Sequence, residues 1–68
     1  MPLIAIYENG ELLAENPALE VVQVLLHERG ITACISPTWA ESVPEWNTDF
    51  GLGWEVRDLP ADWQPPEL

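Results

Sequence analysis

The chain has 68 residues, and its twelve acidic residues face only two arginines and no lysine, so its formal net charge at pH 7 is -10. This balance argues against direct binding to nucleic acid or to an anionic membrane surface, because both depend on clustered lysine and arginine. It predicts instead a partner with a basic protein surface, such as a nucleic-acid-binding protein.

At this length the chain is one domain at most, and an apolar fraction of 47% is too high for a disordered acidic tail. A core this small leaves stability marginal, so completion of the fold by a homodimer stays open. A single cysteine, Cys34, excludes an intramolecular disulfide, and no basic N-terminal stretch precedes a long apolar run. We therefore expect a cytoplasmic protein.

A β-hairpin is expected first along the chain. Residues 3–7 form a short apolar run that is typical of a buried strand. Asn9 and Gly10 follow, and this pair is the strongest short signal for a hairpin because both central residues of the turn need a positive φ. Residues 12–14 are then either a short return strand or irregular backbone that leads into the next element.

One amphipathic helix is expected from Pro17 to Arg29. Asn16 is a good N-cap, Pro17 suits the first helical position, and Gly30 supplies the stop. The apolar residues between these ends recur at helical spacing and are Leu19, Val22, Leu25 and Leu26. This pattern predicts that one face of the helix covers a sheet.

An alternating stretch, residues 31–36, follows the helix and is expected to be a strand. A strand, a capped helix and a second strand make a βαβ unit, whose two strands pair in parallel. From Pro37 onward, proline, glycine and asparagine predict a long loop with at most one helical turn at residues 39–42. Residues 54–59 alternate again, which predicts a last strand.

Together these elements predict an α+β fold. Its expected form is a small three- or four-stranded sheet with one βαβ unit and a single helix, from about Pro17 to Arg29, on one face. Residues 1–59 are expected to form the domain, and residues 60–68, with three prolines, an extended C-terminal tail.

No catalytic, metal or cofactor site is predicted, and we expect no enzyme activity. Cys34 falls inside the expected strand and lacks the electropositive surroundings that activate a nucleophilic thiol. Glu41, Glu45 and Asp49 are four residues apart, which on a helix would make a carboxylate ladder. Pro44 argues against a continuous helix there, so a dedicated metal site is not expected.

The expected helix opens with Asn-Pro at residues 16–17 and ends in the pattern Leu-Leu-x-x-x-Gly-Ile at residues 25–31, with a strand directly after it. In this respect residues 15–35 resemble prokaryotic signal-transducing domains with a PII-like, ferredoxin-like fold. The resemblance implies a βαβ arrangement and a regulatory role in which the domain senses a metabolite or a protein partner.

Acidic residues stand beside tryptophans three times in the C-terminal half, at residues 45–46, 54–55 and 62–63. Either the rings are core and the acids a solvated rim, or the two form a binding surface, since tryptophan dominates interface energetics and carboxylates select arginine and lysine. The candidate binding residues are Trp39, Glu41, Glu45, Trp46, Asp49, Glu55, Asp58, Asp62 and Trp63.

These features favour a small, non-enzymatic binding protein that docks on a basic partner surface. Inhibitors, DNA mimics and immunity proteins, including those of phages and mobile elements, share this size and charge. The alternative is the regulatory signal-transducing domain that the resemblance implies.

Overall fold

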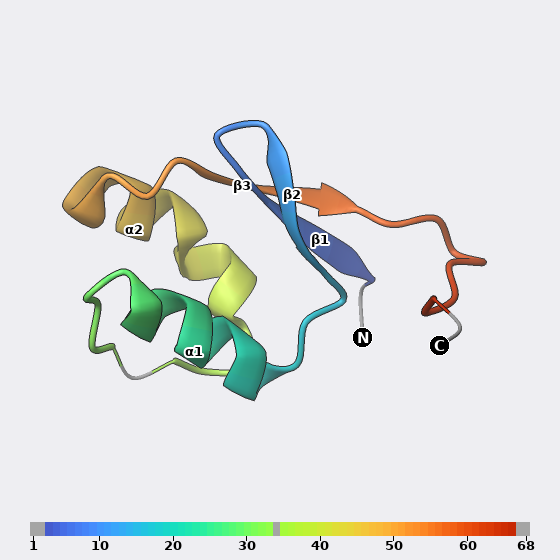
Figure 1. Cartoon of the computed structure of the whole chain (residues 1–68), viewed down its shortest axis with the longest axis horizontal. Helices are drawn as coiled ribbons and strands as arrows, with labels where there is room; N and C mark the ends of the chain where they lie inside the picture. Colours follow the sequence, from blue (N-terminus) through green and yellow to red (C-terminus); the bar gives the residue numbers. More distant parts are fainter. Residues whose placement is uncertain (1–2, 34, 67–68) are drawn as a thin grey trace.

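The computed structural model describes residues 3–33 and 35–66, and it places a three-stranded sheet on one side of the molecule and the helices on the other (Figure 1). The elements are β1 (Ile4–Glu8), β2 (Glu11–Glu15), α1 (Leu19–Glu28), the 3-10 helix η1 (Trp39–Ser42), α2 (Val43–Phe50) and β3 (Trp54–Asp58). The strand order is β2-β1-β3, and both pairings are antiparallel. The predicted α+β class with a three-stranded sheet is confirmed, while Cys34 lies outside the described residues.

The N-terminal hairpin forms as predicted. Asn9 and Gly10 have φ values of 51° and 86°, the left-handed backbone that a two-residue hairpin turn needs. Residues 12–14 belong to β2, so the return strand is present. The register between β1 and β2 shifts between Ile6 and Tyr7, and an irregularity of this kind makes an edge strand a poorer template for further pairing.

The predicted βαβ unit is wrong. β1 pairs with β2 on one edge and with β3 on the other, so neither edge is left for a parallel strand. The described part of residues 31–36 contains no strand, although Ile31 is buried and Ala33 and Ile35 pack against the core. Their alternation therefore reflects packing on the core by residues that lie outside the sheet.

The start of α1 differs from the prediction because Asn16 has another task. Asn16 takes a φ of 44° and donates its backbone N–H to Ile4 O at 2.7 Å, which closes the end of the hairpin. Left-handed backbone is tolerated by asparagine better than by most residues. The N-cap is therefore Ala18, and Pro17 precedes the helix.

The end of α1 is a Schellman motif built on the predicted stop at Gly30. Gly30 has a φ of 76° and donates its N–H to His27 O at 2.9 Å, and Ile31 donates to Leu26 O at 3.0 Å. The motif turns Ile31 back toward the core beside Leu26. This explains why Ile31 is buried although it belongs to no strand.

A second helix replaces most of the predicted loop, so the expectation of a single helix is wrong. The predicted turn at residues 39–42 forms as η1, and α2 follows directly. Pro44 stands in the first turn of α2, where a helix leaves its N–H groups without internal partners, so the missing N–H costs nothing. Gly51 ends the helix with a φ of 67° and donates its N–H to Asn47 O at 2.9 Å.

The core lies between the sheet and the helices. Its buried hydrophobic residues include Ile6, Val22, Leu26, Val43, Leu52 and the rings of Trp39, Trp46 and Trp54. Trp46 and Trp54 meet edge to face, with ring centres 6.2 Å apart and planes at 82°. Of the two readings of the tryptophans, the core reading is right for these three rings.

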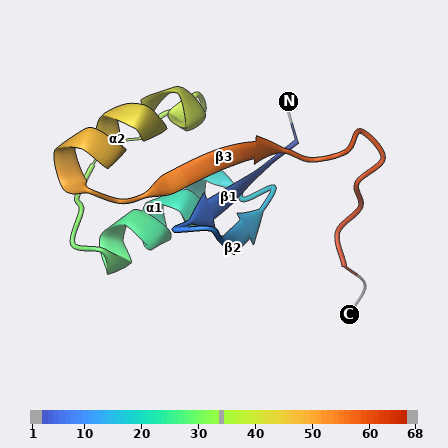
Figure 2. The same cartoon turned by 90° about the horizontal axis from the view of Figure 1, so that it is seen from above.

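After β3 the chain continues beyond the end of the sheet. This end is the one opposite α2 (Figures 1 and 2). Leu59 donates its N–H to Leu3 O at 2.8 Å, and Trp63 Nε1 donates to Glu15 Oε2 at 3.2 Å. Residues 60–66 contain no helix or strand, and residues 67 and 68 lie outside the described part. A domain boundary at residue 59 stays a prediction.

Candidate binding surface

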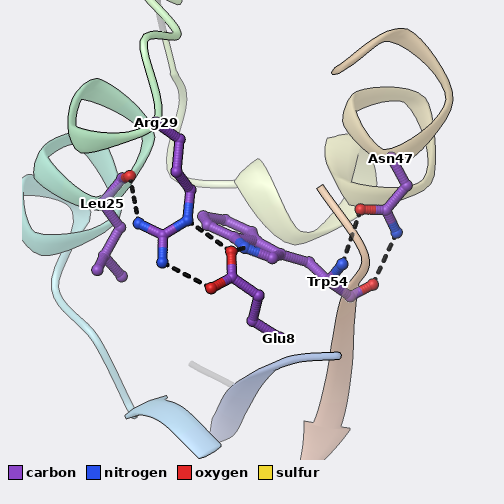
Figure 3. Close-up of polar contacts among 5 residues, drawn as sticks. All are labelled: Glu8, Leu25, Arg29, Asn47 and Trp54. Carbon is purple, nitrogen blue, oxygen red and sulfur yellow. Dashed lines mark hydrogen bonds and ion pairs between the residues drawn. The ribbon is translucent and has the colours of Figure 1, made fainter. Parts of the chain in front are cut away.

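Glu8, at the end of β1, lies at the centre of a polar cluster that joins the sheet to α1 (Figure 3). Arg29 donates from Nε to Glu8 Oε2 at 2.6 Å and from Nη2 to Glu8 Oε1 at 2.8 Å, a two-point pairing. Trp54 Nε1 donates to the same Oε2 at 2.9 Å. Arg29 also donates from Nη1 to Leu25 O at 2.8 Å, and its Cζ lies 5.8 Å from the centre of the Trp54 ring. These contacts fasten β1, β3 and the end of α1 to one another.

This cluster sets the charge state of Glu8. Hydrogen bonding from Arg29 lowers the pKa of Glu8 from 4.5 to about 2, with a smaller contribution from Trp54, and outweighs the opposing effect of burial. The same pairing raises the pKa of Arg29. The side chains of Arg29 and Glu8 keep exposures of 23% and 26%, so water screens the pair only in part. Glu8 is therefore ionised at neutral pH and acts as a structural group.

Asn47, on α2, fixes the start of β3. Its Nδ2 donates to Trp54 O at 2.7 Å, and Trp54 N donates to Asn47 Oδ1 at 2.9 Å (Figure 3). The side-chain amide thus replaces the backbone of a neighbouring strand at this point. It ties α2 to the sheet through two bonds to one residue.

Arg57, on β3, is also paired within the protein. Its Nε and Nη2 donate to Glu55 at 3.0 and 3.2 Å, and its Cζ lies 4.0 Å from the centre of the Tyr7 ring. Arg57 lowers the pKa of Glu55, and Glu55 raises the pKa of Arg57. Both side chains are largely exposed, so this pair contributes little to stability. The pair matters for the surface charge instead, because Glu55 neutralises the second arginine within the protein.

The other acidic residues that the structure describes form no ion pair with any described residue, and all of them are exposed. They are Glu11, Glu15, Glu20, Glu28, Glu41, Glu45, Asp49, Asp58 and Asp62. Since both arginines of the chain are already paired, these carboxylates carry an excess negative charge that faces solvent.

Glu41, Glu45 and Asp49 follow one another at intervals of four along η1 and α2, and we call these three residues the acidic stripe. They are exposed, whereas Val43 and Trp46 of the same segment are buried. The expectation that Pro44 prevents a helix here is wrong, because α2 contains Pro44 in its first turn. Glu45 and Asp49 therefore lie one turn apart on α2, and Glu41 precedes them in η1. Like charges four residues apart on a helix repel and cost it some stability.

The structure does not gather all nine predicted binding residues in one place. Trp39 and Trp46 are buried, so neither ring is available as an exposed anchor, which corrects that part of the prediction. Trp63 is half-buried beside Glu15. Asp58 lies at the end of β3 and Asp62 in the segment that extends past the sheet (Figure 2).

An apolar pocket of about 400 Å³, which no feature of the sequence predicted, lies beside the start of the acidic stripe. Its lining includes the less exposed residues Ile4, Pro17 and Trp39 and the exposed residues Asn16, Thr38 and Glu41. These residues come from β1, from the connection between β2 and α1, and from η1 with the turn before it. The pocket forms where segments that are far apart in the sequence pack together, so no local sequence pattern predicts it.

Within residues 3–33 and 35–66, no group of three or more His, Cys, Asp or Glu side chains could hold a metal ion. None of the helices in this part of the chain has the length and hydropathy to cross a membrane. Comparison with known proteins adds no assignment, because no protein-family model, no curated protein and no solved structure matches the chain.

Proposed function

We propose that this chain is a small, non-enzymatic binding protein whose acidic surface docks on a basic surface of a protein partner. The observation that carries this proposal is the internal pairing of both arginines, Arg29 with Glu8 and Arg57 with Glu55. The exposed carboxylates elsewhere on the described chain are left without a cation of their own. An unneutralised surface of this kind accelerates encounter with basic proteins and repels acidic ones.

The acidic stripe is the part of this surface with the firmest support. Trp46 lies in the core beneath it, and Asn47 ties the same helix to Trp54 of β3. A binding residue on a fixed helix loses less conformational entropy on association than one on a loop. Phe50, at the end of α2, is 52% exposed and offers an apolar contact next to the stripe.

Inhibitors, DNA mimics and immunity proteins work through surfaces of this charge, and a nucleic-acid-binding protein is a partner of fitting chemistry. A cytoplasmic location, with or without a homodimer, is consistent with this role. Direct binding to nucleic acid is disfavoured by the same charges.

Neutralising the acidic stripe is expected to abolish capture of the partner. The triple variant Glu41→Gln, Glu45→Gln, Asp49→Asn would be used as bait in a lysate beside the wild type, and captured proteins identified by mass spectrometry. Basic proteins retained by the wild type at low salt should be lost, because the stripe no longer attracts them.

A triple variant of equal charge change, Glu11→Gln, Glu20→Gln, Glu28→Gln, serves as the matched control, since these exposed acids lie on β2 and α1. It should keep most of the capture. Equal losses in both triples would show that net charge alone, and not the stripe, governs binding. Capture of acidic proteins by the wild type would contradict the proposal itself.

The second candidate is a regulatory domain that senses a small metabolite. The resemblance in residues 15–35 does not support it further, because the βαβ arrangement that the resemblance implies is absent from the described sheet. The apolar pocket beside Trp39 favours this candidate, since ligand sites are usually concave and mostly apolar. Binding of an uncharged metabolite would be insensitive to ionic strength, whereas docking on a basic protein would weaken as salt rises.

A further inference from the structure

The pocket beside the acidic stripe is formed in advance rather than opened by a ligand. Pro17 and Pro37 have fixed φ angles, and Asn16 is held by its bond to Ile4 O. Trp39 is buried in the core and supplies part of the wall. A site whose walls are held by the fold needs little reordering when it is filled, which favours binding.

The charge at the pocket selects what can enter it. Both arginines and the histidine of the chain lie outside its lining, and among the described residues that line it Glu41 is the charged one. An anionic ligand would meet an apolar wall and a carboxylate with no donor cation, so the pocket disfavours it. An apolar group next to a positive charge satisfies both the wall and Glu41.

The pocket and the acidic stripe share Glu41, so a partner on one reaches the other. A basic segment that pairs with Glu45 and Glu41 brings its neighbouring side chains over the pocket opening. A volume of about 400 Å³ accommodates a large apolar side chain. Complexes commonly gain most of their affinity from one such anchor in a desolvated pocket, surrounded by polar contacts.

We propose that this pocket receives an apolar side chain of the basic partner, flanked in the partner's sequence by lysine or arginine residues that pair with Glu41 and Glu45. This inference rests on the proposed function. It reverses the expectation from the sequence that tryptophans of this chain contact the partner as anchors. The tryptophans of this chain do not insert into the partner; Trp39 lines the pocket into which the partner inserts.

Three blocked pentapeptides test the inference on the intact, isotope-labelled protein by amide NMR. One has four lysines around a central phenylalanine, one has four lysines around a serine, and one has four glutamates around a phenylalanine. The lysine–phenylalanine peptide is expected to shift the amide resonances of Thr38, Ala40 and Glu41. The serine peptide should bind at least tenfold more weakly, and the glutamate peptide should cause no shift.

Two single variants locate the charge contribution. Glu41→Gln should weaken binding of the lysine–phenylalanine peptide at least twofold at low salt. Glu20→Gln, which changes another exposed acid, on α1, should leave the affinity unchanged. Both substitutions are on the surface, so folding is not at risk.

Other outcomes would overturn the pocket assignment in distinguishable ways. Equal binding of the phenylalanine and serine peptides, with strong salt dependence, would remove the pocket but leave the acidic docking surface standing. Binding of the glutamate peptide at these amides would show an apolar site indifferent to charge. Shifts at these amides on raising protein concentration alone would make a second copy the occupant. No binding of either lysine peptide would count against both the pocket and the proposed function.

Discussion

Glu8→Gln is expected to lower the free energy of unfolding by about 2 kcal/mol at pH 7, because a pKa lowered from 4.5 to about 2 corresponds to at most about 3 kcal/mol and water screens part of the interaction. The substitution removes the charge that Arg29 and Trp54 both bind. It leaves Arg29 without its carboxylate partner at the junction of β1 and α1. Urea denaturation followed by tryptophan fluorescence would measure the loss.

The loss should also depend on pH, with a sign fixed by the lowered pKa. The folded state holds Glu8 ionised, so its contribution is fully present above pH 4.5 and disappears as the pH falls toward 2. The difference between wild type and Glu8→Gln should therefore shrink to roughly 1 kcal/mol at pH 3. The difference is the informative quantity, because protonation of the other carboxylates also relieves repulsion in both proteins.

Glu55→Gln is the matched control, since it removes the same charge from the exposed pair with Arg57. Its denaturation midpoint should stay close to that of the wild type. If Glu8→Gln and Glu55→Gln shifted the midpoint equally, or if the Glu8 effect did not change between pH 7 and pH 3, the structural role assigned to Glu8 would be wrong.

Asn47→Ala is expected to cost about 2 kcal/mol, because it leaves the N–H and C=O of Trp54 without partners at a buried position. The loss should appear as faster hydrogen exchange at the Trp54 amide as well as a lower denaturation midpoint. The change also removes the polar tie between β3 and α2, which carries Glu45 and Asp49 of the acidic stripe.

Thr48→Ala, the neighbouring substitution on α2, provides the comparison for Asn47→Ala. Thr48 is exposed, and its Oγ1 only bonds back to Pro44 O within the same helix. Its removal should change the midpoint little. An equal effect of the two variants, or an unchanged exchange rate at Trp54, would mean that Asn47 does not hold the helix to the sheet.

The sequence predicts those parts of the fold, such as turns and helix ends, that depend on one or two neighbouring residues. Asn9-Gly10 gives the hairpin turn, and Gly30 gives the end of α1, because a positive φ at these positions is a property of the residues themselves. Pro44 led to a wrong prediction of a loop, because its effect depends on where in a helix it stands. The same residue breaks a helix interior and suits its first turn, and only the position of α2 decides between the two.

The errors concern choices between distant segments. Residues 31–36 and residues 54–58 both alternate, and the sequence does not reveal which of them β1 selects. β3 occupies the edge of β1, and further hydrogen bonds hold it there. They run between Asn9 N and Gly53 O and, twice, between Asn47 and the backbone of Trp54. Pairings of this kind link residues far apart in the chain and have no local periodicity.

The candidate surface could be predicted in charge but not in shape. The excess of acids is readable from composition, and the spacing of the acidic stripe is visible at residues 41, 45 and 49. The pairing of Arg29 with Glu8 is not, because twenty-one positions separate the two residues.

The most direct test of the proposed function is the association rate of the captured partner with the wild-type protein, measured by stopped-flow fluorescence as ionic strength rises. If an unneutralised acidic surface selects the partner, the rate should fall about tenfold or more between 20 and 300 mM salt, and the stripe triple variant should be slow at both. A rate that stays constant over this range, with the triple variant as fast as the wild type, would contradict it.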